Sequence, residues 1–298
     1  MSAITLTLLG LFLFGLAAGS FINVVSFRYK PGHRLIFTHS VGGRSKCRSC
    51  QSTLRWYELI PLFSFLIQGF KCRHCEHAVS WQYPIIEFLT GLLTVGLPIF
   101  FIYFFQVNHL IGLTEGKTAF FVFIALWILA TYILITVSII DLRHQIIPDQ
   151  SNLLLGLIGV FIFFIKLANK EVFRYSGSFT KNYIEILGAS QNLWLNLGLA
   201  LLVTLLFFGS IIFFSKGKGM GLGDLKLAIP MAFLLGWPDA LLAFMFAFFF
   251  GAAFGLMMIF KKEKDLKDMV PFGPFMVLGL YTVVLYGEPI LSWYFSLL

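Results

Sequence analysis

Long apolar runs separated by polar segments dominate the pattern of the chain. The runs of transmembrane length lie at residues 4–25, 83–105, 118–140, 152–168, 194–214, 238–260 and 270–293. A helix of roughly 20 residues crosses a hydrocarbon core of about 30 Å, and a helix satisfies every backbone polar group within one segment. The pattern therefore predicts an all-α, polytopic membrane protein.

The apolar stretch 225–260 is too long for one crossing of an ordinary bilayer. Gly236, Trp237 and Pro238 interrupt it, and a proline inside a helix removes a backbone hydrogen bond. We therefore expect a short helix at 225–235 and a full one at 238–260. Together with the other runs, this division predicts about eight transmembrane helices.

Lys and Arg are distributed unevenly among the polar segments. Seventeen of the 22 fall within 28–82, 141–151, 215–226 and 261–268, and five fall at the opposite face or its helix ends. Basic residues are retained on the cytoplasmic side of a membrane, so these four segments are expected to be cytoplasmic. A single span over 225–260 would place the run 261–264 outside, against this rule.

The same pattern divides the chain into three parts. Residues 1–27 are expected to form the first transmembrane helix, residues 28–82 a large cytoplasmic loop, and residues 83–298 a helical core with a polar external loop at 169–193. The composition, with 58% hydrophobic and 12% charged residues, argues against a soluble fold. The net charge of +8 does not predict nucleic-acid binding, because no basic segment carries interleaved aromatic residues.

All four cysteines lie in the large cytoplasmic loop. They form Cys47-x-x-Cys50 and, 21 residues later, Cys72-x-x-Cys75. Two such pairs can place four thiolates tetrahedrally around one Zn²⁺. Disulfides would require an oxidising compartment, whereas the charge pattern places this loop in the reducing cytosol. We therefore predict a structural zinc site, which stabilises a fold without indicating a reaction.

Asp141 and Asp224 stand at the cytoplasmic edge of predicted helices: Asp141 follows the run 118–140, and Asp224 opens the short helix. An ionisable group is costly there unless it faces a partner or a polar cavity. Two carboxylates in a partly dry site can share a proton, so that one activates water and the other donates to a carbonyl. Each could instead cap a helix or meet a cation such as Arg143 or Lys226. Position alone does not separate these alternatives.

Glycine alternates with other residues from Gly217 to Gly223, directly before Asp224. The segment contains neither GKS, GKT nor GxGxxG, and no strand precedes it, so it does not predict a nucleotide site. Glycine allows a backbone to approach an extended peptide closely and frees φ, so that the aspartate can be aimed. Gly221 and Gly223 are therefore candidate supporting residues, although a GxGD string alone is a weak motif.

Asp149 follows Ile147-Pro148 and precedes the run 152–168. It is well placed to act as the N-cap of that helix, and we favour this structural role over catalysis. His109 and His144 have no third partner in the sequence for a Ser or Cys triad, which argues against nucleophilic hydrolysis.

Taken in order, these motifs resemble those of the bacterial type IV prepilin peptidases, which are GxGD intramembrane aspartic proteases. The resemblance spans nearly the whole chain, except the loop 169–193 and much of 33–46. It rests on Gly19-Ser20-Phe21-Ile22-Asn23-Val24-Val25 with Arg28, the two CxxC pairs with Trp56, Glu58, Ile60-Pro61 and Ser64 between them, Tyr83-Pro84-x-x-Glu87, Asp141 with Ile147-Pro148-Asp149, Gly221-Leu222-Gly223-Asp224 with Lys226, and Pro271-Phe272-Gly273-Pro274.

The resemblance implies that Asp141 and Asp224 are the catalytic pair, with Gly221, Gly223, Lys226 and Asp149 in support. It implies cleavage of the basic leader of prepilins and pseudopilins on the cytoplasmic side of the bacterial inner membrane. It also implies N-methylation of the new N-terminus from S-adenosylmethionine, an activity usual in members that carry the four cysteines. No motif by itself indicates a methyl-donor site, and Glu87 and the cysteine loop are the places to look.

Two other functions would also place aspartates at the membrane. A relative of presenilin would carry a Tyr-Asp pair deep within a span, whereas Ile140 precedes Asp141, and it would not explain the cysteines. A transporter or channel could use the aspartates as cation sites, with the zinc loop as a regulator. That alternative predicts charged groups near mid-span and paired halves, and the sequence shows neither.

Overall fold

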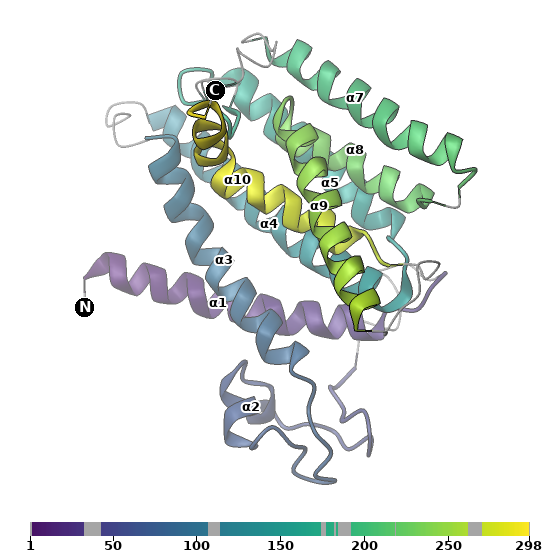
Figure 1. The fold of residues 1–298 in the computed structure, drawn as a ribbon. Helices are drawn as coiled ribbons and strands as arrows, with labels where there is room; N and C mark the ends of the chain where they lie inside the picture. Colours follow the sequence, from purple (N-terminus) through teal and green to yellow (C-terminus); the bar gives the residue numbers. More distant parts are fainter. Residues whose placement is uncertain are drawn as a thin grey trace. The chain divides into compact units, whose positions relative to one another are not determined.

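The structure is a computed structural model that describes residues 2–32, 43–106, 114–173, 177–181, 183, 192–217, 219–261 and 270–297. These residues are mainly helical (Figure 1). The long helices are α1 (Ala3–Arg28), α3 (Gln82–Phe104), α4 (Thr114–His144), α5 (Asp149–Ala168), α7 (Leu193–Phe214), α9 (Asp239–Phe260) and α10 (Gly273–Phe295), and the short ones are η1 (Trp56–Leu59), α2 (Phe63–Ile67) and α8 (Leu222–Leu235).

Seven of the described helices are long and apolar enough to cross a membrane, and all seven correspond to runs predicted from the sequence. The all-α, multi-pass character of the chain is therefore confirmed. The division of 225–260 is also confirmed, because α8 ends at Leu235 and α9 begins at Asp239. Gly236 ends α8 with a φ of 81°, a left-handed conformation that glycine adopts without steric cost. The basic run 262–264 lies outside the described residues.

The chain divides into two compact units. The N-terminal unit comprises Met1–Tyr103 and Trp127–Thr136, and the C-terminal unit comprises Phe104–Leu126 and Val137–Leu298. The N-terminal unit holds α1, the cysteine-bearing segment and α3, together with the middle of α4. The C-terminal unit holds α5 to α10 and both ends of α4. Each unit is described separately below.

Small residues bring α1 and α3 into close contact in the N-terminal unit. A Cβ added at Gly15 would lie 2.5 Å from Thr94 Oγ1, and one at Gly19 would lie 2.7 Å from the Cα of Glu87. Helices in lipid associate through such small residues because the backbones can then approach closely. The hydroxyls of Thr94 and Tyr132 add a hydrogen bond of 2.7 Å between α3 and α4.

In the C-terminal unit α8 packs against α5 and α7, and α9 packs against α10. A Cβ at Gly159 of α5 would lie 2.6 Å from the Cβ of Phe233 in α8. The ring of Phe208 in α7 meets that of Phe244 in α9 edge-on, with centroids 4.9 Å apart. This packing positions α8 and α10, whose first turns belong to the candidate site.

Candidate active site and metal centre

Asp141 lies in the last turn of α4, near its C-terminal end. The helix continues to His144, so Asp141 does not end the span as the sequence suggested, and its side chain is buried, with 4% of the residue exposed. Its Oδ2 accepts a hydrogen bond of 2.8 Å from the backbone N–H of Gly273. Gly273 is the first residue of α10, where backbone N–H groups are free and the helix dipole favours a negative charge.

Gly273 is the partner that sequence analysis missed. A Cβ at this position would lie 2.8 Å from Asp141 Oδ2, closer than real Cβ contacts allow. Only glycine therefore lets the N-terminus of α10 reach the carboxylate without a shift. The Pro-Phe-Gly-Pro motif was noted in the sequence, but nothing in it pointed to Asp141.

Asp224 lies in the first turn of α8 and outside the seven candidate spans. Burial raises the pKa of Asp224 to about 6, with a further contribution from the negative charge of Asp141, while the backbone of Gly221 opposes the shift. The repulsion from Asp141 places both carboxylates within electrostatic range of each other. The structure therefore brings two aspartates that are distant in sequence within electrostatic range of each other.

The two glycines before Asp224 make only ordinary contacts with their surroundings. A Cβ at Gly223 would lie 3.7 Å from the Cβ of Ile147, which is ordinary van der Waals contact, so Gly223 marks where α8 meets the segment before α5. A Cβ at Gly221 would lie 3.8 Å from Asp224 Oδ2. Both glycines thus lie next to Asp224, and at neither position would a Cβ clash with its neighbours.

The predicted N-cap role of Asp149 is wrong. The N-cap of α5 is Pro148, in extended conformation, and Asp149 is the first helical residue. Its Oδ1 accepts a hydrogen bond of 2.7 Å from Lys226 Nζ, because the close packing of α5 and α8 brings the two helix starts together. Lys226 consequently pairs with Asp149. Both side chains are exposed, so this pair contributes little to stability.

The four cysteines converge in a lobe of the N-terminal unit, residues 43–81. Both CxxC pairs adopt the same local fold, because isolated bridges join Lys46 to Thr53 and Lys71 to Ala78. Residues after the second cysteine of each pair, Gln51 and Glu76, have φ values of 59° and 54°. The two turns therefore present their thiols alike.

The thiols have the geometry of a metal centre. All four Sγ atoms lie within 4.8 Å of one another, and Cys47 Sγ and Cys75 Sγ are 3.8 Å apart. A tetrahedron with metal–sulfur bonds of about 2.3 Å has edges of about 3.8 Å. The cluster is therefore positioned to bind a metal ion.

The electrostatics of the cluster lead to the same conclusion. Hydrogen bonds from the side chain and backbone of Ser52 lower the pKa of Cys50 to about 6, which favours the thiolate that binds metal. The backbone of His77 lowers the pKa of Cys75, but burial and the adjacent thiols outweigh it and raise that pKa to about 11. Four thiolates this close need a cation to ionise together.

Glu87, a residue singled out for the methyl-donor site, connects the lobe to α3. Its Oε2 accepts a hydrogen bond of 2.8 Å from the backbone N–H of Leu62, which precedes α2 with a φ of 60°. Nearby, Asn23 of α1 donates to the backbone oxygen of Tyr83 at 3.2 Å. The motif residues of α1 and α3 thus form a polar layer beneath the lobe.

A second buried carboxylate lies in the C-terminal unit, at the start of α9. Asp239 is fully buried and accepts hydrogen bonds from Ser178 Oγ at 2.8 Å, the Phe179 N–H at 2.7 Å and Thr180 Oγ1 at 3.0 Å. The segment 177–181 belongs to the predicted external loop 169–193, of which 174–176, 182 and 184–191 lie outside the described residues. This part of the loop is therefore tied into the helices.

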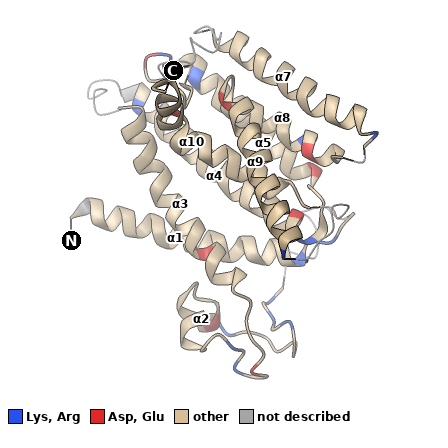
Figure 2. Ribbon diagram, in the orientation of Figure 1, with Lys and Arg blue, Asp and Glu red and all other residues tan. Residues whose placement is uncertain are grey.

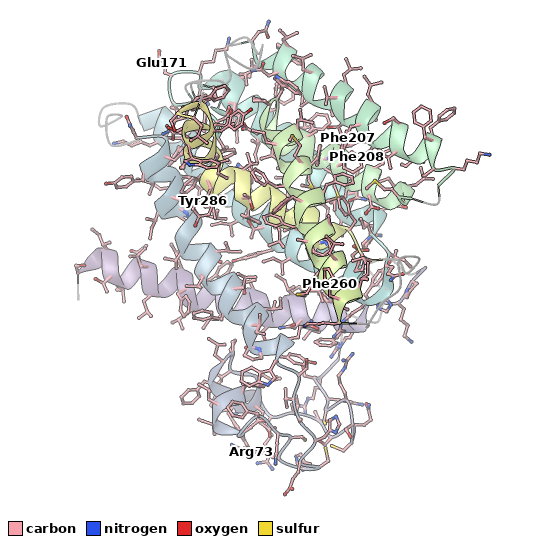
Figure 3. The ribbon with its side chains drawn as sticks, in the orientation of Figure 1. Arg73, Glu171, Phe207, Phe208, Phe260 and Tyr286 are labelled. Atoms are coloured by element: carbon pink, nitrogen blue, oxygen red, sulfur yellow. The ribbon has the colours of Figure 1, made fainter. Side chains whose placement is uncertain are left out.

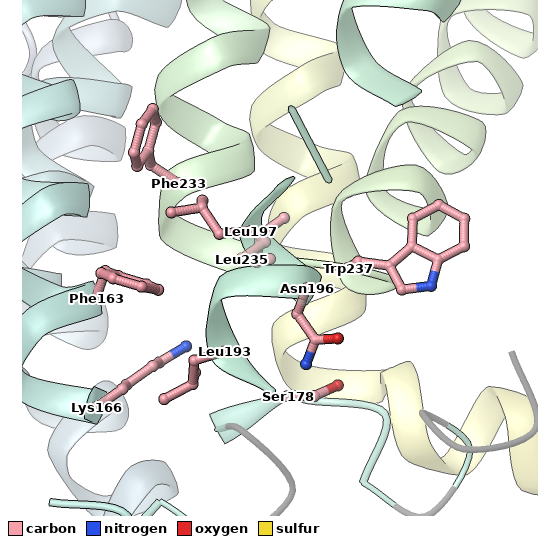
Figure 4. A pocket seen from close by; sticks show the side chains of 10 residues that line it. Phe163, Lys166, Ser178, Leu193, Asn196, Leu197, Phe233, Leu235 and Trp237 are labelled. Atoms are coloured by element: carbon pink, nitrogen blue, oxygen red, sulfur yellow. The ribbon is translucent and has the colours of Figure 1, made fainter. Parts of the chain in front are cut away.

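Beside this carboxylate lies a small pocket (Figure 4). Its volume of about 20 Å³ has room for a single water molecule. It is lined by Lys166 and Asn196, both almost fully buried, and neither amide atom of Asn196 has a hydrogen-bond partner among the described residues. Lys166 is 17 residues beyond Asp149 on α5, about 25 Å along the helix. The pocket is therefore separate from the Asp141 and Asp224 pair.

Comparison with known proteins agrees with this arrangement. Residues 128–256 match the Type IV leader peptidase family, and residues 13–101 match the Bacterial Peptidase A24 N-terminal domain. The second match holds the cysteine lobe, and the first holds both aspartates. No solved structure matches the chain.

Relatives match over almost their whole length. A prepilin leader peptidase/N-methyltransferase of Bacillus subtilis (strain 168) is 30% identical over 287 residues, which cover 96% of this chain and 97% of the relative. Proteins of the same name from Aeromonas salmonicida (strain A449) and Pseudomonas aeruginosa are 27% and 28% identical, covering 96% and 95% of this chain and 92% and 91% of theirs. None of these names refers to transport.

Proposed function

The chain belongs to the type IV leader peptidase family, and we propose that it removes the basic leader of prepilins and pseudopilins by aspartic-protease chemistry. The observation that carries the proposal is the coupling of a buried carboxylate, Asp141, with a half-buried one, Asp224, whose pKa it helps to raise. A pair that holds one proton supplies both a base and an acid, and no covalent intermediate is needed.

The environments of the two aspartates suggest their roles. Asp141 accepts the N–H of Gly273 at the start of α10, and this backbone donor orients its carboxylate toward the helix start. Asp224 lies in a site that disfavours its charge. Asp141 is therefore the base that takes a proton from water, and Asp224 is the acid that donates to the oxygen of the scissile carbonyl.

The atoms balance over one cycle. Water attacks the carbonyl carbon, Asp141 takes its proton, and Asp224 protonates the carbonyl oxygen to give a tetrahedral diol. The diol then collapses: Asp141 passes its proton to the leaving nitrogen, and Asp224 recovers a proton from a hydroxyl. The products are a carboxylic acid on the leader and a free amine on the pilin.

That free amine is the natural substrate of a second reaction. We infer that the chain also N-methylates it, with S-adenosylmethionine as methyl donor, since relatives of the same length carry both activities in their name. Glu87 and the polar layer under the cysteine lobe belong to the part that matches the A24 N-terminal domain, and we place this activity there.

We further propose that the metal is one structural Zn²⁺, held by Cys47, Cys50, Cys72 and Cys75. The four thiolate donors and the 3.8 Å separation of Cys47 and Cys75 suit zinc better than a hard cation such as Mg²⁺ or Ca²⁺. Its role is to hold the two CxxC turns together, because a lobe of this size has few buried apolar residues of its own.

The chain is proposed to lie in the bacterial inner membrane with the lobe and both aspartates on the cytoplasmic side. Seventeen of the 22 basic residues in the segments assigned to that side support this orientation. A basic leader is held in the cytosol by the same rule, so its cleavage site meets the membrane edge. The partners are thus prepilins or pseudopilins and membrane lipid.

A single incubation tests the peptidase and the methyltransferase together. Purified protein is mixed with a pilin peptide that carries its leader, with and without S-adenosylmethionine, and the products are weighed by mass spectrometry. We expect leader loss in both mixtures and one added methyl group only with the donor. An intact peptide in both mixtures would refute the peptidase.

Variants assign the catalytic pair. Asp141→Asn and Asp224→Asn should each lower cleavage roughly 10³-fold or more, because neither variant can exchange a proton at that position. Glu171→Gln, an exposed acidic residue labelled in Figure 3, is the matched control and should cleave normally. Cleavage by the purified double variant at the normal rate would exclude this pair.

The metal is tested by elemental analysis. Cys47→Ser combined with Cys75→Ser should remove zinc and make the lobe sensitive to protease, because two thiolates hold the ion weakly. One zinc per chain in the unaltered protein is expected. An unchanged zinc content in the double variant would contradict the assignment.

A further inference from the structure

The cysteine lobe carries large apolar side chains on its outside, although its sequence reads as a polar loop. These side chains come from η1, α2 and the segments that flank them, and between 37% and 77% of each residue is exposed. They are Trp56, Leu59, Ile60, Phe63, Leu66, Ile67, Phe70 and Trp81. A concentration of this kind on a polar module marks an interaction site.

The short helix α2 has two different faces. Phe65 points inward, where its ring lies 4.9 Å from that of Phe70 and 5.2 Å from that of Trp81, and only 7% of it is exposed. Phe63, Leu66 and Ile67 follow the i, i+3, i+4 spacing and are 57%, 63% and 56% exposed. We call these three residues the outer face of α2. The lobe has its own small core around Phe65, and the outer face of α2 is not part of that core.

The attachment of the lobe keeps this face near the bilayer. The lobe follows α1, which ends at Arg28, and precedes α3, which begins at Gln82. Both helices are long and apolar enough to cross a membrane. Trp81 directly precedes α3, and tryptophan is enriched at the headgroup level of membranes.

The charge of the lobe suits an anionic surface. Six basic residues of the lobe are exposed, namely Arg44, Lys46, Arg48, Arg55, Lys71 and Arg73. Figure 2 shows basic residues in blue along the loops around α2. Of its two acidic residues, Glu58 is buried beside Arg73 and Glu76 is exposed. The lobe stays cationic even when a metal–thiolate centre adds two negative charges. Each Lys or Arg near an anionic leaflet favours binding.

We propose that the outer face of α2 inserts into the headgroup region of the membrane's own anionic leaflet and holds the cysteine lobe flat against it. The apolar side chains leave water for the acyl boundary, while the basic residues contact lipid phosphates, the combination found in interfacial anchors. This inference goes beyond the proposed reactions, and only the exclusion of a pilin as the occupant rests on the proposed function.

A leader-bearing pilin is the other candidate occupant, and the charges disfavour it. The leader is basic under the proposed function, and the exposed charge of the lobe has the same sign. Like charges at an interface oppose association. The lipid surface, with the opposite charge, fits better.

Site-specific photocrosslinking in proteoliposomes tests the proposal. The photoreactive residue p-benzoylphenylalanine replaces Leu66 on the outer face or, as the matched control, Thr53, an exposed polar residue of the first CxxC turn. The full chain is reconstituted in vesicles of phosphatidylglycerol and phosphatidylethanolamine, irradiated, digested and analysed by mass. An unchanged metal content shows that each variant retains the folded lobe.

We expect a several-fold higher yield of lipid adduct at Leu66 than at Thr53, with a lower yield at Leu66 in vesicles of phosphatidylcholine alone. Equal yields at the two positions, or none at either, would overturn the proposal. So would adducts of Leu66 with another part of this chain, or with pilin peptide in preference to lipid when both are present.

Discussion

The C-terminal unit contains two buried acidic sites that differ in how well their charges are satisfied. At Asp239, three hydrogen-bond donors from the segment 178–180 surround one carboxylate. Lys166 lies close enough to interact with it electrostatically. At the other site, Asp141 has one backbone donor among the described residues, from Gly273, and its negative charge acts on a second carboxylate, Asp224.

The difference distinguishes a carboxylate with a structural role from carboxylates suited to a reaction. A carboxylate that accepts three hydrogen bonds, as Asp239 does, ties a loop to a helix, which is a stabilising role. A carboxylate whose charge is disfavoured by burial and by a second carboxylate, as at Asp224, lowers the stability of the fold, a property common at catalytic sites. Burial alone would not have told the two sites apart, since Asp141 and Asp239 are both buried.

The largest expected effect on stability is at the satisfied site. Asp239→Ala should lower the free energy of unfolding by about 3–5 kcal/mol, because it leaves Lys166 buried without its counter-charge. Thermal unfolding in detergent measures the loss. Lys166→Met/Asp239→Leu removes both charges and should recover much of it. If Asp239→Ala is as stable as the unaltered protein, the hydrogen bonds of Asp239 to the segment 178–180 do not stabilise the fold.

Replacing Asp224 is expected to change the free energy of unfolding in the opposite direction. Its pKa of about 6 lies above the ordinary 3.8, so the folded state loses stability as pH rises through this range and stays lower above pH 6. Asp224→Asn should therefore raise the free energy of unfolding near pH 7.5 by up to about 3 kcal/mol. Near pH 4 the gain should vanish. A destabilised variant at both pH values would break the contrast between the two sites.

A smaller effect is expected at the glycine that touches Asp141. Gly273→Ala places a Cβ against Oδ2 and forces the carboxylate to move. A displacement of that kind should lower the rate of leader cleavage roughly 10- to 100-fold while KM changes little. Gly255→Ala in α9, where a Cβ meets nothing within 4 Å, is the control. Equal rates for the two variants would remove Gly273 from the site.

The smallest effect is expected at the exposed pair of Lys226 and Asp149. Lys226→Ala should cost about 0.2–1 kcal/mol of stability, and less in high salt, since exposed ion pairs are weak and screened. Lys261→Ala, an exposed lysine after α9, provides the comparison in thermal unfolding. A loss much larger than this range would indicate that the pair holds α8 in place for Asp224.

Features that depend on neighbouring residues were predicted from the sequence. The seven long helices correspond to apolar runs, and the break between α8 and α9 follows Gly236 and Pro238. The convergence of the four thiols was also expected. Each CxxC turn closes within a few residues, and the short spacing between the two pairs is typical of one metal site. Helices and tight turns are local structures, so their signals are local as well.

The tertiary structure alone decided which distant groups meet. Gly273 and Asp141 are 132 residues apart, Lys226 and Asp149 are 77 apart, and Ser178 and Asp239 are 61 apart. Asp149 was misassigned as a cap because the sequence shows the helix start but not the lysine that α8 brings to it. Apolar periodicity specifies that a helix forms, whereas the side chains that share one site are set by helix packing, which depends on steric fit between surfaces far apart in the chain.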